Sequence, residues 1–173
     1  MVMAGAVIAA PGFAAETKAG KKRFELPTKF GLGGVAIGNG FRVSPDDEAE
    51  SALVTAWENG VRYFDTSPWY GLGLSERRFG HFLDDKKPDD YVISTKIGRL
   101  LVPDDKFRHA MWKGDLGFNY KYDYSAEGTR RSVEDSLQRM GISSIDVGFI
   151  HDLSPDNGDM KDKWTEYFAV AEK

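Results

Sequence analysis

Side chains that can move protons stand at the ends of three short hydrophobic runs in this chain. The runs end at Asp65, Lys96 and His151, and Tyr70 follows the first run after a short loop. In proteins built from alternating strands and helices, active sites assemble at the carboxyl ends of parallel strands. A carboxylate, a phenol, an amine and an imidazole that meet there can carry out proton transfer. We therefore predict an enzyme active site formed by these four residues.

The chemistry of the four groups suggests a division of labour. Tyr70 exchanges the proton, and the Lys96 ammonium beside it favours the ionised phenol. Asp65 supplies the counter-charge that Lys96 needs, and His151 hydrogen-bonds a substrate oxygen and orients it. Each residue taken singly has an ordinary structural alternative, such as a turn-forming aspartate or a core histidine. Their shared position after successive strands favours the catalytic interpretation.

The segments that carry these residues alternate between strand and helix patterns. The predicted elements are a strand over Phe30–Ile37, a helix that starts with Ser44 as N-cap and Pro45 at its first position and ends at Gly60, a strand ending at Asp65, a helix over Leu74–Asp84, a strand ending at Lys96, a helix that Ser125 caps and Gly141 ends, a strand ending at His151, and a last amphipathic stretch through Trp164, Phe168 and Ala171. The residues expected to share the inward helix faces are Ala49, Ala52, Leu53, Ala56 and Trp57 on the first helix, Phe79, Phe82 and Leu83 on the second, and Val133, Leu137 and Met140 on the third. This alternation predicts an α/β fold with a parallel sheet and right-handed connections.

A connection rich in aromatic residues, Leu100–Tyr124, interrupts the alternation. A loop of this length in a compact domain is usually functional or disordered, and the density of aromatics favours a folded lid. The whole pattern gives about four strand–helix units, whereas a closed (β/α)8 barrel has eight units and about 250 residues. We therefore predict that residues 30–173 are the amino-terminal half of a TIM (β/α)8 barrel, a truncated half barrel. A self-standing four-stranded domain is the alternative.

Residues 1–29 form a separate region, which we interpret as a signal-like or disordered leader. Met1–Ala15 is almost wholly apolar, and Gly12–Ala15 resembles a leader cleavage site, but no basic residue precedes it. Two interpretations stay open. Either this region is a flexible tail, or it is a secretory leader whose basic start lies upstream.

Composition excludes several classes of function. The chain of 173 residues has no cysteine, so disulfides, thiolate nucleophiles and thiolate metal sites are excluded. The net charge is −4, and the basic cluster Lys21–Arg23 is too short for a nucleic-acid-binding face. No run is long enough and apolar enough to span a bilayer. His81, His109 and His151 are scattered without metal-binding spacing, so we predict no metal site.

The segment Gly31–Ala36 matches the letters of a dinucleotide-binding fingerprint, G-x-G-x-x-A. That motif needs a strand before it and a helix that opens on it, whereas Pro27 precedes this segment and Gly38–Gly40 follows it. We therefore interpret these glycines as points of close backbone approach in a first barrel strand and its loop.

Taken together, the motifs of this chain resemble those of the aldo-keto reductases. The resemblance rests on the order and spacing of Asp65–Gly71, Glu76, Ser94–Lys96 and His151–Asp152, and it covers residues 30–173. Tyr124–Gly128 and Ser132–Gly141 are similar to one bacterial branch, which includes aldose 1-dehydrogenases acting on L-fucose-type sugars, L-galactose dehydrogenases and pyridoxal dehydrogenases.

The resemblance implies a (β/α)8 barrel enzyme that uses NADP or NAD and a tetrad formed here by Asp65, Tyr70, Lys96 and His151. The implied reaction is hydride transfer between a nicotinamide and a carbonyl carbon or an aldose hemiacetal carbon. The substrate is then a small carbonyl compound or sugar, and Tyr70 is the general acid and base.

The same resemblance implies what this chain lacks. Most contacts to the cofactor are expected in the second half of the barrel, so the cofactor-binding residues are unknown and the isolated chain is expected to be weakly active or inactive. A non-catalytic nucleotide-binding or interaction module and an inert fragment are the alternatives. The oligomeric state stays open, as does the compartment, which is the cytoplasm by family default or the periplasm if the amino terminus directs export.

Overall fold

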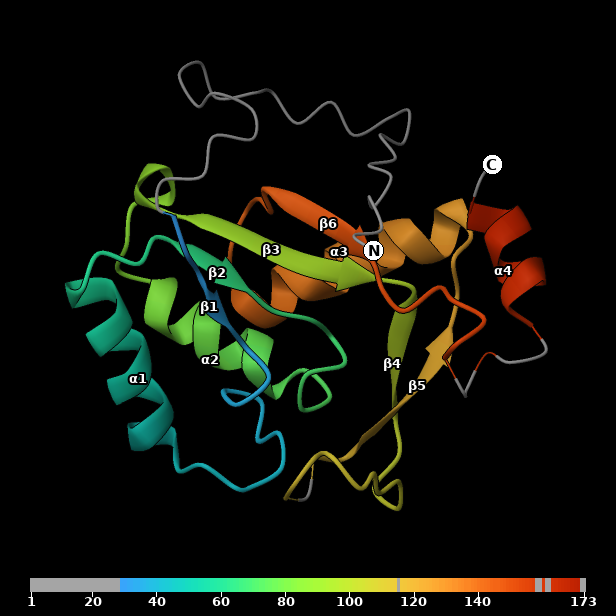
Figure 1. Cartoon of the computed structure of the whole chain (residues 1–173), viewed down its shortest axis with the longest axis horizontal. Helices are drawn as coiled ribbons and strands as arrows, with labels where there is room; N and C mark the ends of the chain where they lie inside the picture. Colours follow the sequence, from blue (N-terminus) through green and yellow to red (C-terminus); the bar gives the residue numbers. More distant parts are fainter. Residues whose placement is uncertain (1–28, 115, 158–159, 161–162, 172–173) are drawn as a thin grey trace.

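The computed structural model describes residues 29–114, 116–157, 160 and 163–171. The leader predicted over residues 1–29 lies outside the described residues apart from Lys29. The elements, in chain order, are β1 (Leu32–Gly33), α1 (Asp46–Glu58), β2 (Tyr63–Asp65), α2 (Leu74–Leu83), the 3-10 helix η1 (Pro88–Asp90), β3 (Val92–Ile97), β4 (Arg99–Pro103), β5 (Phe118–Tyr122), α3 (Ala126–Met140), β6 (Val147–Ile150) and α4 (Trp164–Ala171), as drawn in Figure 1.

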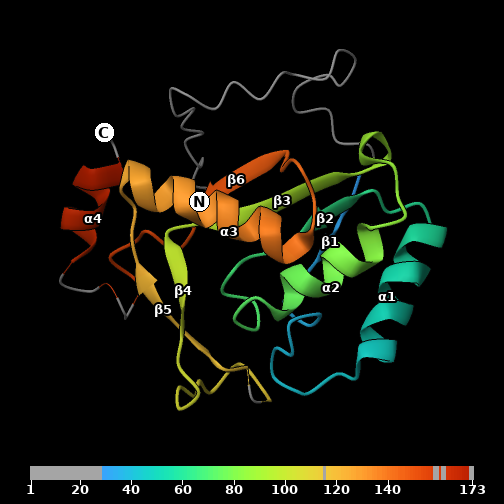
Figure 2. The same ribbon diagram turned by 180° about the vertical axis from the view of Figure 1, so that it is seen from behind.

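Four strands form one parallel sheet in the order β1-β2-β3-β6. The helices α1, α2 and α3 lie side by side along the same face of this sheet, which Figure 2 shows from the helix side. Each helix therefore connects two parallel strands, as the alternation of patterns predicted. Because all four strands point the same way, their carboxyl ends lie along one edge, where the predicted site residues follow.

The core lies between the sheet and the helices. Phe64 on β2, Phe79 on α2 and Ile93 on β3 are completely buried, and the rings of Phe64 and Phe79 lie 5.8 Å apart. The inward face predicted for α2 is confirmed, since Phe82 and Leu83 are also buried. These contacts fix α2 against β2 and β3, so the loop between β2 and α2 is anchored at both ends.

The face predicted for α1 is only partly right. Ala49 and Leu53 are buried and Trp57 is half-buried, but Ala52, at the edge of this face, is exposed. Ser44 is not the N-cap of α1. The helix starts one residue later, with Pro45 as its N-cap and no side-chain cap, and acidic residues fill its first turn.

The position of Ser44 explains this correction. Ser44 is buried, and its backbone N–H donates to Asn39 Oδ1 at 3.1 Å instead of belonging to the helix. The end of α1 agrees with the prediction, because Gly60 has a left-handed φ of 85° just after the helix.

The predicted strand Phe30–Ile37 shrinks to Leu32–Gly33, and the chain then turns through Gly34 to Asn39. A Cβ atom at Gly34 would lie 2.7 Å from Phe79 Cε2 and 2.9 Å from Asp65 O. The backbone therefore crosses the end of β2 at close range, which a regular strand with side chains could not do. No helix opens on this segment, in agreement with the interpretation of its glycines as points of close approach.

Both ends of α3 agree with the prediction. Ser125 Oγ accepts a hydrogen bond from the Gly128 N–H at 3.0 Å, and Gly141 ends the helix with a φ of 67°. The face differs, because the buried residues are Gly128, Ser132, Ser136 and Met140, whereas Val133 and Leu137 are only half-buried. Small residues face inward because α2 and α3 approach closely: a Cβ at Gly80 would lie 2.5 Å from Met140 Cα.

The predicted lid is an antiparallel hairpin, β4 and β5, that projects from the carboxyl end of β3 (Figure 1). Gly98, with a φ of 106°, makes the turn from β3 into β4. The hairpin and its loop pack on the β2–α2 loop through a second apolar cluster, in which Trp69 and Trp112 are buried with their ring centroids 5.3 Å apart. The aromatic connection is thus a folded lid over that loop, as predicted. In the part of the chain that the structure describes, no helix has the length and hydropathy needed to cross a bilayer.

Candidate active site

Lys96 and Asp65 form an ion pair at the carboxyl ends of the neighbouring strands β3 and β2. Lys96 Nζ lies 2.7 Å from Asp65 Oδ2 and donates a second hydrogen bond to Thr66 O at 2.9 Å. The register brings them together: Asp65 is paired with Ser94, two residues before Lys96 on the same side of β3. Ser94 Oγ donates to Asp65 Oδ1 at 2.6 Å, so both carboxylate oxygens are bound. The ammonium is thereby held at a defined point at the edge of the sheet.

Tyr70 lies against this ammonium. Lys96 Nζ is 4.6 Å from the centroid of the Tyr70 ring. The loop reaches this position through the left-handed residues Gly71 and Leu72, with φ angles of 65° and 50°, and a Cβ at Gly71 would lie 3.0 Å from Gly38 Cα. The Tyr70 hydroxyl makes no hydrogen bond with any residue that the structure describes.

His151 completes the group from the end of β6. Its ring lies 5.8 Å from the Tyr70 ring, nearly perpendicular to it, and its Nδ1 is 3.1 Å from Ser67 Oγ. The side chain is buried, with 8% exposure. Burial first, and then the positive charges of Arg99 and Lys96, lower the pKa of His151 to about 3, while the Asp152 carboxylate opposes the shift. The imidazole is therefore neutral at physiological pH.

The structure thus brings all four predicted site residues into one cluster. Sequence analysis missed two serines that hold them: Ser94, which binds Asp65, and Ser67, which binds His151 and accepts the Trp69 N–H at 3.0 Å. The strand period could have indicated Ser94, which lies two residues before Lys96. Nothing local indicated Ser67, because its partner lies far away in the sequence.

Glu76 belongs to the motif set but not to this cluster. It is completely buried, accepts a hydrogen bond from Thr95 Oγ1 at 2.8 Å and pairs with Arg139 Nε at 2.6 Å. These contacts join α2, β3 and α3. Glu76 therefore stabilises the packing of the elements that carry the site and is not itself part of the cluster.

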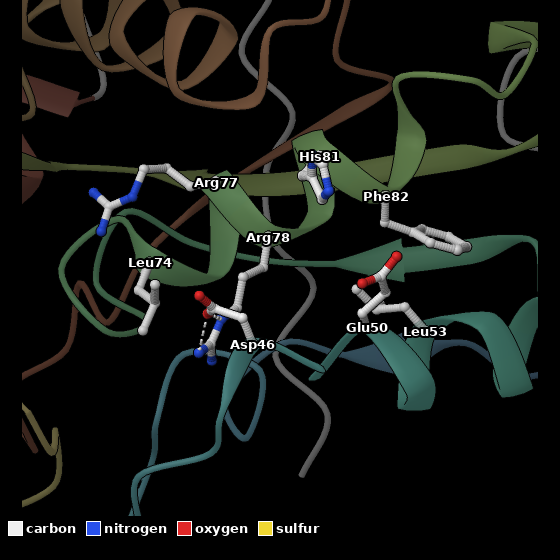
Figure 3. A pocket seen from close by; sticks show the side chains of 8 residues that line it. All are labelled: Asp46, Glu50, Leu53, Leu74, Arg77, Arg78, His81 and Phe82. Carbon is white, nitrogen blue, oxygen red and sulfur yellow. Dashed lines mark hydrogen bonds and ion pairs between the residues drawn. The ribbon is translucent and has the colours of Figure 1, made fainter. Parts of the chain in front are cut away.

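A hollow of about 290 Å³ lies elsewhere, between α1 and α2 (Figure 3). Its lining includes Leu53, Phe82 and Arg77, and the ion pair of Arg78 with Asp46 closes one end. None of the four clustered residues lines it, so it is separate from the chemistry described here. Among the described residues, no group of three histidine, aspartate or glutamate side chains is placed to hold a metal ion.

A parallel sheet with helices along one face, and titratable side chains at the carboxyl ends of its strands, is the arrangement of a partial (β/α) barrel. The chain belongs to the aldo/keto reductase family, whose sequence model matches residues 29–170.

Named relatives agree with this assignment. The D-threo-aldose 1-dehydrogenase of a Pseudomonas species is 40% identical over 149 residues, 83% of this chain and 45% of that protein. The pyridoxal 4-dehydrogenase of Microbacterium luteolum is 36% identical over 137 residues, 73% of this chain and 40% of that protein. The chain therefore spans less than half the length of these relatives, and they support the predicted branch.

The solved structure of a glycerol dehydrogenase from Gluconobacter oxydans superimposes with a TM-score of 0.55 and 31% sequence identity. The match covers 72% of this chain and 36% of that protein. The described residues are therefore part of a (β/α)8 barrel, and the predicted fold class is confirmed.

Proposed function

We propose that this chain carries the proton-transfer site of a nicotinamide-dependent oxidoreductase. The reaction interconverts an aldose hemiacetal with a lactone, or an aldehyde or ketone with an alcohol. The observation that carries the proposal is the cluster itself: a Tyr70 hydroxyl to which no described residue is hydrogen-bonded, with the Lys96 ammonium against its ring and the His151 imidazole facing it.

Tyr70 is the general acid and base of the proposed reaction. Removing hydride from a carbon that bears a hydroxyl leaves a carbonyl, and the hydroxyl proton must go to a base; the reverse reaction needs the same proton back. Tyr70 suits this exchange because its hydroxyl has no partner among the described residues. The positive charge beside the ring stabilises negative charge that develops on the phenol oxygen while the proton is transferred.

Lys96 supplies that charge, and its surroundings hold it in place. Asp65 and the Thr66 carbonyl accept two of its N–H bonds, and Ser94 fixes the Asp65 carboxylate in turn. A lysine left free would search many rotamers, whereas this one is fixed before substrate arrives. Asp65 is therefore proposed to position Lys96 and not to exchange the proton itself.

His151 is proposed to orient the substrate oxygen. A neutral imidazole can donate one hydrogen bond without competing with Tyr70 for the proton, and burial keeps this imidazole neutral. With Ser67 Oγ bound at Nδ1, the Nε2–H can donate to a substrate oxygen, because Asp152 Oδ2 lies 3.5 Å from Nε2 and makes no hydrogen bond with it. The oxygen would then lie between an imidazole donor and the phenol.

The clustered side chains fit the reacting end of a nicotinamide cofactor, NAD or NADP. Tyr70, Lys96 and His151 lie close together at the carboxyl ends of the strands. These residues would border the nicotinamide ring, and no described residue is assigned to the rest of the cofactor. When bound, the nicotinamide accepts or donates the hydride.

A sugar is the proposed substrate class. The two relatives described above are named for aldose and pyridoxal dehydrogenation, and an aromatic wall stands beside Tyr70: the Trp112 ring lies 6.1 Å from it and the Trp69 ring packs on Trp112. Aromatic faces together with a few placed polar groups are typical of small-molecule sites. The D-threo-aldoses are therefore the first substrates to test.

The test is Tyr70→Phe, with Tyr167→Phe on α4 as a matched control outside the cluster. Reduction of NAD or NADP by D-threo-aldoses is followed with this chain and, in parallel, with the Pseudomonas relative changed at its tyrosine aligned with Tyr70. We expect Tyr70→Phe to lower kcat by at least about 100-fold, since general acid–base catalysis contributes that much, and to leave cofactor affinity nearly unchanged. The control should keep its rate. A loss smaller than about tenfold would overturn the assignment, and cofactor binding without turnover in both proteins would favour a binding module.

A further inference from the structure

Arg99 is a buried cation at the base of the β4–β5 hairpin. Its side chain is 3% exposed, and its Nη2 donates to Asp152 Oδ2 at 2.9 Å and to Tyr122 Oη at 3.0 Å. Its Nε and Nη1 are buried and have no hydrogen-bond partner within the part of the chain that the structure describes. Toward the described residues, the guanidinium therefore uses only one of its three nitrogens.

Aromatic rings surround the rest of the guanidinium. Arg99 Cζ lies 5.1 Å from the centroid of Trp69, 5.5 Å from that of Tyr120 and 5.0 Å from that of Tyr122. Such rings attract a cation, but they do not replace the missing hydrogen bonds. Apolar residues of similar volume are often at least as stable as a buried charge, so stability alone does not explain an arginine here.

The contacts of Arg99 lead to both sides of the His151 imidazole. On one side, Asp152 Oδ2 lies 2.9 Å from Arg99 Nη2 and 3.5 Å from His151 Nε2, so a single oxygen faces both groups. On the other side, Arg99 packs on the ring of Trp69, and the backbone N–H of Trp69 donates to Ser67 Oγ, the partner of His151 Nδ1.

Asp152 adopts an unusual backbone conformation, with a φ of 52°. Residues other than glycine rarely adopt this left-handed region, and they do so where the surrounding structure fixes them. The charged contact with Arg99 is the interaction that holds this half-exposed carboxylate next to the imidazole.

We propose that Arg99 is a positioning residue for His151: through Asp152 it fixes the ring orientation and the Nε2–H tautomer, and it makes both depend on the docked hairpin. The proposal rests on the proposed function only in that His151 is to donate from Nε2 to a substrate oxygen. A carboxylate oxygen near Nε2 favours a proton on that nitrogen, and the Ser67 hydroxyl can then donate to Nδ1.

The charges around His151 support this role. The groups that face it are Lys96 from β3, Arg99 from β4, Tyr70 from the β2–α2 loop, Tyr124, which donates to His151 O at 2.8 Å, and its neighbour Asp152. After burial, the largest influence that lowers the pKa of His151 is the charge of Arg99, while Asp152 raises it. Removing the guanidinium should therefore raise this pKa and release Asp152 at the same time.

The experiment is a nitrogen-15 NMR titration of the histidine side chains in the 173-residue chain, which reports protonation and tautomer without substrate or cofactor. We compare Arg99→Met with Tyr122→Phe, which removes the neutral partner of the same nitrogen and keeps the charge. Arg99→Met should raise the pKa of His151, because Arg99 lowers it more than Asp152 raises it, and should reduce the Nε2–H population. Tyr122→Phe should change neither quantity. Arg99→Lys keeps the positive charge, so the pKa of His151 should stay close to its low value in the unchanged chain.

An unchanged pKa and tautomer in Arg99→Met, or equal changes in Tyr122→Phe, would overturn the proposal. If Arg99→Met does not fold, Asp152→Asn decides, because asparagine also tolerates the left-handed backbone. The proposal then requires a weaker preference for Nε2–H, and an undiminished preference overturns it. Since no turnover is measured, this outcome is independent of whether Tyr70→Phe abolishes activity.

Discussion

Acidification should weaken the fold through one histidine, His151. Its pKa lies near 3 in the folded chain, against an ordinary value of 6.5. As the pH falls, the unfolded chain binds this proton first, so the contribution of His151 is complete above about pH 6.5 and is lost progressively down to about pH 3. Each pH unit in this window is worth about 1.4 kcal/mol, so going from about pH 7 to about pH 5 costs roughly 2 kcal/mol of unfolding free energy.

Urea unfolding of the chain and of His151→Gln at both pH values measures this contribution. Glutamine can still accept a hydrogen bond from Ser67 but does not titrate, so the acid loss of the variant should be smaller by roughly 2 kcal/mol. The difference between the two proteins should stop changing above about pH 7, where the histidine is neutral in both states. An equal loss on acidification in both proteins would refute the buried, neutral imidazole and with it the proposed role of His151 as donor.

Two further substitutions test the site and the fold. Lys96→Met removes the ammonium beside the Tyr70 ring, and we expect a loss of kcat of about 100-fold or more; an unchanged kcat in the nicotinamide assay would contradict this. Gly80→Ala places a Cβ 2.5 Å from Met140 Cα and should destabilise the chain by about 1–3 kcal/mol in urea. Gly148→Ala, which meets nothing within 4 Å, is its control and should change stability by less than about 0.5 kcal/mol; equal effects would contradict the close helix contact.

Much of the sheet and the candidate site could be predicted because they follow from local patterns. Alternating strands and helices imply parallel strands, and parallel strands place their last residues at one edge, which is why Asp65, Lys96 and His151 meet. Tyr70 follows because its loop is short and glycine-rich.

Other features depend on contacts that no local pattern contains. The hairpin forms because residues 99–103 pair with residues 118–122 across a long aromatic loop, and no sequence period marks that pairing. The prediction of Ser44 as the N-cap of α1 was wrong because the Asn39 side chain binds the Ser44 backbone. The sequence analysis assigned no role to Arg99, because an arginine after a strand is usually exposed. Its burial depends on the rings of Trp69, Tyr120 and Tyr122, which surround it in the fold.

The hairpin also offers a route to engineering. Both of its strands come from one uninterrupted stretch of chain, and the cross-strand partners Arg99 and Tyr122 sit where it meets the barrel. A segment with this construction can be exchanged between homologous enzymes as a cassette, provided that the two junction residues are kept. Chimeras made in this way would vary the aromatic wall beside Tyr70 while Asp65, Lys96 and His151 at the strand ends stay constant.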